Sequence, residues 1–88
     1  MTAFVVPETE IETVFTESQF RDQVSWMLRW RISKTTLYRH RCDFDGCTEL
    51  LTYDYARAIA YFAKLRRNRI DVSTAKQKTI DFCKRHNL

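Results

Sequence analysis

Glycine and proline are nearly absent from this chain, and their scarcity constrains its fold more than any other feature. Each occurs once in 88 residues, as Gly46 and Pro7. β-Sandwiches and barrels need many turns, which draw heavily on both residue types. Hydrophobic residues make up 44% of the chain, which argues against disorder. A chain of this length has room for one core, so the sequence predicts a single, mainly α-helical domain.

Helix-capping residues stand before three segments with apolar residues at helical spacing. Thr16 and Gln19 form a capping-box pattern, which predicts a helix over about residues 17–29. Thr52 is placed to cap a long helix, and a last helix is expected to begin at Ser73. The residues expected to face inward from these last two helices are Tyr55, Ala56, Ile59, Phe62, Ala63, Ala75, Thr79, Phe82 and Cys83.

A fourth, shorter helix follows the first after a very short connection. Ser33 is a good N-cap, and residues 34–41 can form two helical turns with Leu37 facing inward. Only residues 30–32 separate this helix from the one before it. Helices joined so tightly must pack at a steep angle, so a helix-turn-helix is predicted.

Residues 42–51, CDFDGCTELL, contain the Asp45-Gly46 pair. Asp-Gly is a strong local signal for a tight hairpin turn. A small two-stranded β-hairpin is therefore expected, which makes the fold a winged helix-turn-helix with about four helices over residues 16–88.

Residues 1–15 differ from the rest of the chain. Pro7 forbids a continuous helix, and Ile11, Thr13 and Phe15 alternate with polar residues at a period of two. An extended N-terminal arm or short edge strand is expected here.

The charges of the chain are arranged in blocks. The net charge is +4, but residues 29–41 carry five basic and no acidic side chains, and residues 63–88 carry eight basic and two acidic ones. The two remaining blocks are acidic. Two basic clusters indicate a localised surface for a polyanion rather than diffuse attraction.

Two stretches resemble a known family. The segment RISKTTLYRH, residues 31–40, resembles the second helix of MerR-type and excisionase-like winged helix-turn-helix proteins, and residues 51–82 resemble the paired helices that follow the wing there. The resemblance implies a DNA-binding module whose second helix enters the major groove. The positions that match it are Lys34, Thr35, Thr36, Tyr38 and Arg39 on that helix, and Arg66, Arg67 and Arg69 in the loop that forms a second wing.

One departure from the family lies in the expected first wing, which carries Asp43, Asp45 and Glu49 where phosphate contact favours basic residues. On the second helix, Arg39 and Arg41 are candidates for bidentate hydrogen bonds to guanine. The arginines at 66, 67 and 69 are expected to hold phosphates and to make binding depend on salt.

Metal binding is an open alternative. His40, Cys42, Cys47, Cys83 and His86 together supply nitrogen and sulfur ligands, although their spacing matches no zinc-finger pattern. An odd number of cysteines favours reduced thiols over a disulfide framework. No cofactor is predicted.

Catalysis and base stacking have weaker support. Gly46 stands alone, which excludes a glycine-rich phosphate loop, and no carboxylate pair has an apolar setting, so the chain is predicted not to be an enzyme. Trp26, Trp30, Tyr38 and Phe44 are candidate stacking platforms for single strands, but aromatics at helical spacing more often belong to a core.

These patterns together predict a sequence-specific regulator of transcription that binds double-stranded DNA, a repressor acting as a homodimer. One short recognition helix covers few base pairs, so two copies are expected on adjacent half-sites. No apolar run is long enough to cross a membrane and no signal-peptide pattern is present, so cytoplasmic location is expected, without a small-molecule ligand. The alternatives are a protein-interaction module, acting as an inhibitor or adaptor, and an excisionase-like architectural factor that bends DNA.

Overall fold

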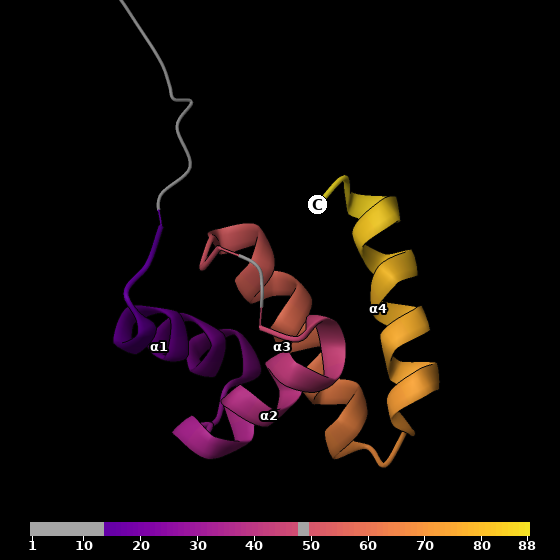
Figure 1. Cartoon of the computed structure of the whole chain (residues 1–88), viewed down its shortest axis with the longest axis horizontal. Helices are drawn as coiled ribbons and strands as arrows, with labels where there is room; N and C mark the ends of the chain where they lie inside the picture. The colour runs from indigo at the N-terminus through magenta and orange to yellow at the C-terminus, as the bar shows by residue number, and fades with distance from the viewer. Residues whose placement is uncertain (1–13, 48–49) are drawn as a thin grey trace, which may run out of the picture.

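Four helices form the part of the chain that the structure describes. The computed structural model describes residues 14–47 and 50–88 (Figure 1). This arrangement agrees with the predicted mainly helical class. The helices are α1 (Glu17–Leu28), α2 (Lys34–Asp45), α3 (Tyr53–Arg67) and α4 (Val72–His86).

The chain enters α1 in an extended conformation. Val14 forms an isolated antiparallel bridge with Thr52, and the N–H of Phe15 donates to the carbonyl of Leu51 at 2.7 Å. These contacts place the end of the predicted N-terminal arm beside the start of α3. The rest of that arm, residues 1–13, lies outside the described residues.

The three predicted N-caps are confirmed. Thr16, Ser33 and Thr52 each accept a hydrogen bond, through the side-chain hydroxyl, from the backbone N–H three residues later, at 3.1 to 3.2 Å. The Gln19 side chain accepts from the N–H of Thr16 at 3.0 Å, which completes the capping box. Each cap satisfies an amide that a helix leaves unpaired, so the helices begin where the sequence placed them.

α4 begins one residue earlier than predicted. Its N-cap is Asp71, whose carboxylate accepts from the N–H of Thr74 at 3.0 Å. A carboxylate also interacts favourably with the positive end of the helix dipole, which favours Asp71 over the expected start at Ser73.

The connection between α1 and α2 is held by side chains of α1. Arg29 ends α1 in the left-handed conformation, with φ 67°, in a turn that contains no glycine. The N–H of Ile32 donates to Ser25 Oγ at 3.2 Å, and its carbonyl accepts from Arg21 Nε at 2.8 Å. Ile32 is itself buried. Both backbone polar groups of Ile32 are therefore hydrogen-bonded to α1, and this fixes the short turn to that helix.

The prediction of a β-hairpin wing is wrong, because α2 occupies the first part of that segment. α2 continues four residues past Arg41 and ends at Gly46, which adopts φ 76° and donates its N–H to the carbonyls of Arg41 and Cys42 at 3.2 and 3.1 Å. Glycine in the left-handed conformation ends helices as readily as it turns hairpins. Phe44 packs with its ring centroid 5.5 Å from that of Phe62, so the apolar face of α2 extends to the end of the helix.

α3 lies at the centre of the fold and packs against the three other helices (Figure 1). Its buried face consists mainly of alanines around Ile59 and Phe62, which allow close approach of neighbouring helices. Phe20 of α1 stacks on Tyr55 at 5.3 Å between ring centroids. The buried residues of the core cluster are Phe20, Val24, Leu28, Ile32, Leu37, Tyr55, Ala56, Ile59, Ala60 and Ala63.

α4 packs on α3 and covers part of its apolar surface. Ala75 and Thr79 of α4 are fully buried. Tyr61 lies parallel to Phe82, with 4.3 Å between ring centroids. The ring of Tyr61 is thus partly covered by α4.

Among the described residues, no helix combines the length and the apolar character needed to cross a membrane.

Candidate nucleic-acid interface

The first two turns of α2 present a basic, solvent-exposed surface. Lys34, Thr35 and Arg39 are exposed, and Tyr38 is 59% exposed although it is aromatic. Thr36 is half-buried, and its hydroxyl accepts from the hydroxyl of Ser33 at 2.8 Å. Four of the five α2 residues that matched the family pattern therefore face solvent.

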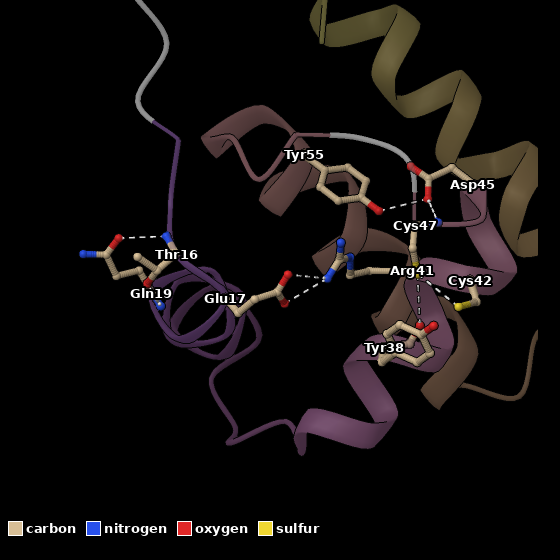
Figure 2. Close-up of polar contacts among 9 residues, drawn as sticks. All are labelled: Thr16, Glu17, Gln19, Tyr38, Arg41, Cys42, Asp45, Cys47 and Tyr55. Carbon is tan, nitrogen blue, oxygen red and sulfur yellow. Dashed lines mark hydrogen bonds and ion pairs between the residues drawn. The ribbon is translucent and has the colours of Figure 1, made fainter.

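Arg41, which was predicted to reach guanine, lies in the interior instead. It is 7% exposed, and its Nη1 lies 3.1 Å from Oε1 of Glu17 on α1 (Figure 2). Its guanidinium also lies 5.7 and 5.9 Å from the ring centroids of Phe20 and Tyr55. Since Arg41 follows the buried Leu37 by four residues, it shares the inner face of the helix. The assignment of Arg41 to base contact is wrong.

The charge of Arg41 is accommodated by its partners. Burial alone lowers the pKa of this guanidinium, but the Tyr55 hydroxyl and the Glu17 carboxylate outweigh that effect and raise it. Tyr55 donates in turn to Oδ1 of Asp45 at 3.0 Å. These four side chains tie the C-terminal half of α2 to α1 and α3.

The predicted second basic cluster lies at the end of α3. Arg67 is exposed and stands on Trp30, with 4.0 Å from the guanidinium carbon to the ring centroid. Arg69 is exposed in the left-handed conformation, with φ 66°. Arg66 is half-buried and donates from Nη1 to the carbonyl of Ile70 at 2.7 Å. Arg67 and Arg69 therefore face solvent, whereas Arg66 shapes the loop.

The two basic clusters lie towards the same edge of the molecule. Both the start of α2 and the α3–α4 connection lie at the lower edge of the molecule in Figure 1. His40 of α2 packs edge-on against Phe62, with 5.8 Å between ring centroids. Burial lowers the pKa of His40 first, and the charges of Arg66 and Arg39 lower it further, against the opposing effect of Asp43. The pKa of the His40 imidazole is thus lowered by one arginine from each basic cluster.

Two exposed arginines in the α1–α2 turn belong to the same region, although they were not singled out from the sequence. Arg29 follows the end of α1, and Arg31 pairs with Asp22 at 2.6 Å. The signal was present in the basic block that begins at residue 29.

A groove of about 550 Å³ runs between α1 and the exposed turns of α2. Lys34 and Tyr38 line one side, and Arg21 with the carboxylate of Glu17 lines the other. The basic surface is therefore indented rather than flat.

The candidate metal ligands do not gather in one place. Among the residues with described positions, no group of three or more His, Cys, Asp or Glu side chains is arranged to hold a metal ion. Cys42 and Cys47 approach each other closely, with 3.0 Å between sulfurs. His86 of α4 packs on Phe82 instead, with 4.5 Å between ring centroids.

The candidate stacking aromatics are dispersed. Phe44 packs on Phe62 and Trp30 lies under Arg67, while Trp26 is 74% exposed on α1. Only Tyr38 lies among the exposed basic residues of α2.

Comparisons with protein-family models, with curated proteins and with solved structures find no match for this chain.

Proposed function

We propose that this protein is a sequence-specific double-stranded DNA-binding regulator of transcription that uses α2 as its recognition helix. The observation that carries the proposal is the exposed basic start of α2, held in a fixed orientation by the turn at Ile32. Arg67, the last residue of α3, and Arg69, in the α3–α4 connection, supply further exposed positive charge. Cytoplasmic location is part of the proposal.

In this proposal the residues of the surface have separate tasks. Arg39 reads a guanine through two hydrogen bonds, and the methyl group of Thr35 packs on a thymine methyl. Lys34, Arg67 and Arg69 contact phosphates and supply affinity without sequence preference. A separate wing is not needed for these contacts. Asp45, expected in an acidic wing, lies instead at the end of α2, where it accepts from Tyr55.

Dimerisation and repression are part of the proposal. A single short helix contacts few base pairs, and two copies on adjacent half-sites give the affinity that an operator requires. A dimer of this size bound at a promoter would block polymerase by occlusion.

A selection of bound duplexes from random DNA, followed by mobility-shift titrations at several salt concentrations, tests the proposal. Arg39→Ala is expected to reduce discrimination at one guanine by between about fivefold and about 150-fold. Arg67→Ala is expected to weaken binding to all duplexes and to lower the salt slope by about 1. Arg85→Ala, on the exposed end of α4, is the matched control and should change neither. No duplex binding at low salt would overturn the proposal.

A protein-interaction module is the second candidate, because four large apolar side chains other than Tyr38 are exposed within residues 14–47 and 50–88: Val14, Trp26, Leu50 and Tyr53. Activity that is indifferent to Arg39→Glu but lost on Trp26→Ala would favour this candidate. An excisionase-like architectural factor would instead bend its DNA strongly, which circular-permutation mobility assays measure.

A further inference from the structure

Two thiols lie against each other at the end of α2. The sulfurs of Cys42 and Cys47 are 3.0 Å apart (Figure 2). A disulfide bond is about 2.05 Å long, so bond formation requires the sulfurs to approach by about 1 Å more. Cys42 is exposed, so a dissolved oxidant can reach the pair.

The backbone explains why two residues five positions apart meet. Gly46 and Cys47 are consecutive left-handed residues, with φ 76° and φ 65°, and they turn the chain back over the last turn of α2. The N–H of Cys47 donates to Oδ1 of Asp45 at 3.0 Å. The Cys47 thiol also points at the carbonyl of Tyr38, at 3.8 Å. A non-glycine residue in this conformation is strained, so the surrounding contacts must hold it there.

We propose that Cys42 and Cys47 are a redox modification site, which a low-molecular-weight disulfide such as oxidised glutathione converts reversibly into an intramolecular disulfide. The inference does not depend on DNA binding. Disulfides in reducing compartments are usually transient and redox-sensing, and the closeness of these two thiols favours ring closure over further reaction with glutathione.

The chemistry proceeds in two exchange steps. The exposed Cys42 thiolate attacks one sulfur of oxidised glutathione, forms a mixed disulfide and releases one glutathione thiolate. The Cys47 thiolate then attacks the Cys42 sulfur and releases the second glutathione. The two cysteines lose two protons and two electrons, and these electrons reduce one glutathione disulfide to two thiols.

The order of attack follows from the surroundings of the two thiols. Partial burial, a hydrogen bond to Cys42 and the charge of the Cys42 thiolate raise the pKa of Cys47 to about 11. Cys47 is therefore a poor first nucleophile. Bonding of the Cys42 sulfur to glutathione removes the Cys42 thiolate charge, one of the causes of the raised pKa of Cys47, which favours ionisation of Cys47 for the second step.

The full chain in glutathione buffers of stepped oxidation ratio, quenched with N-ethylmaleimide and mapped by mass spectrometry, tests the proposal. Trypsin releases residues 42–57 as one peptide that contains Cys42 and Cys47 but not Cys83. We expect this peptide to lose two hydrogen atoms at a more reducing ratio than the one at which Cys83 acquires glutathione. Dithiothreitol should reverse the change.

Single substitutions provide the controls. Cys83→Ser should leave the oxidation of peptide 42–57 unchanged. Cys47→Ser should stop ring closure and leave glutathione on Cys42, in a protein whose circular dichroism confirms folding. Glutathione on Cys42 alone in the unsubstituted protein, a bond to Cys83, or three equally alkylated thiols at the most oxidising ratio would each overturn the proposal.

Discussion

Arg39 and Arg41 are two residues apart in the chain and lie on opposite faces of α2. Positions two apart on a helix do not share a face, so only one of the two can follow Leu37 into the core. Arg41 is the buried one, and Arg39 is exposed. Arg41 therefore contributes to the stability of the fold, whereas Arg39 is free of the core and available for the proposed recognition of DNA.

Substitution of each arginine separates these tasks. Arg41→Ala removes the 3.1 Å contact with Glu17 and the packing on two aromatic rings, and should destabilise the protein by about 2 kcal/mol. Arg39→Ala should change stability by less than about 0.5 kcal/mol, because its side chain is exposed. Urea denaturation measures both. Equal losses would contradict the placement of Arg41.

His40 makes stability depend on pH. Because its pKa is lowered from 6.5 in the folded state, the unfolded chain takes up a proton first as the pH falls. The contribution of His40 is therefore full above pH 6.5 and is lost as the pH falls towards the folded pKa.

Replacement of His40 by Gln isolates this effect. Between about pH 7.5 and about pH 5.5, the free energy of unfolding should fall more steeply for the natural chain than for His40→Gln, by at most about 1.4 kcal/mol per pH unit. Chemical denaturation at several pH values measures the difference. His86→Gln, on the exposed end of α4, is the matched control, and parallel profiles for the natural chain and His40→Gln would contradict the burial of His40.

At the scale of elements, the sequence predicted where helices begin better than where they end. Thr16, Ser33 and Thr52 act through hydrogen bonds within three residues, so a local pattern identifies them. The Asp45-Gly46 pair is compatible with a hairpin and with a helix C-terminus. The contact of Phe44 with Phe62, far along the chain, favours the helix, and no local pattern contains that contact.

In the candidate site, too, local patterns predicted some residues correctly, and contacts between distant parts of the chain decided the others. Lys34, Thr35, Tyr38 and Arg39 were placed on an exposed helix start because Ser33 fixed the helical register. The inward turn of Arg41 and the engagement of Arg66 with the Ile70 carbonyl depend on neighbours from α1 and the α3–α4 loop. Those neighbours meet only when the chain is folded.

Gly46 should be replaceable by a residue that tolerates the left-handed conformation. A Cβ at this position meets no atom within 4 Å, so the cost of Gly46→Ala is conformational, about 1 to 2 kcal/mol. Gly46→Asn should cost less, because Asn enters this region more readily. Thermal denaturation compares the two variants. Equal stability of Gly46→Ala and the natural chain would contradict this helix end.

At the scale of the whole molecule, α3 is the element through which the others are joined. α1, α2 and α4 all pack on it. α4 is held there by two buried small residues, Ala75 and Thr79, and by the stack of Phe82 on Tyr61. This arrangement concentrates the larger side-chain contacts of α4 towards its C-terminal half.

Phe82→Ala should loosen α4 more than the rest of the fold. Loss of a partly buried ring that stacks at 4.3 Å is expected to cost about 2 to 3 kcal/mol. Hydrogen exchange should accelerate most for the amides of α4, and the exchange rates of the α1 amides should increase much less. Lys84→Ala, on the exposed face of α4, is the control. Uniform acceleration in all helices would contradict separate docking of α4.

The two hydrogen bonds at Ile32 have a consequence for how the protein would meet a duplex. With its N–H and carbonyl both held by α1, the connection cannot swivel, so α1 and α2 move as one rigid body. The α1–α2 connection is already ordered in the folded protein, so ordering it adds no entropic cost when the protein binds a duplex. Adjustment to different half-site spacings would then have to come from the relative position of two protomers, while each α2 keeps a constant angle to its own α1.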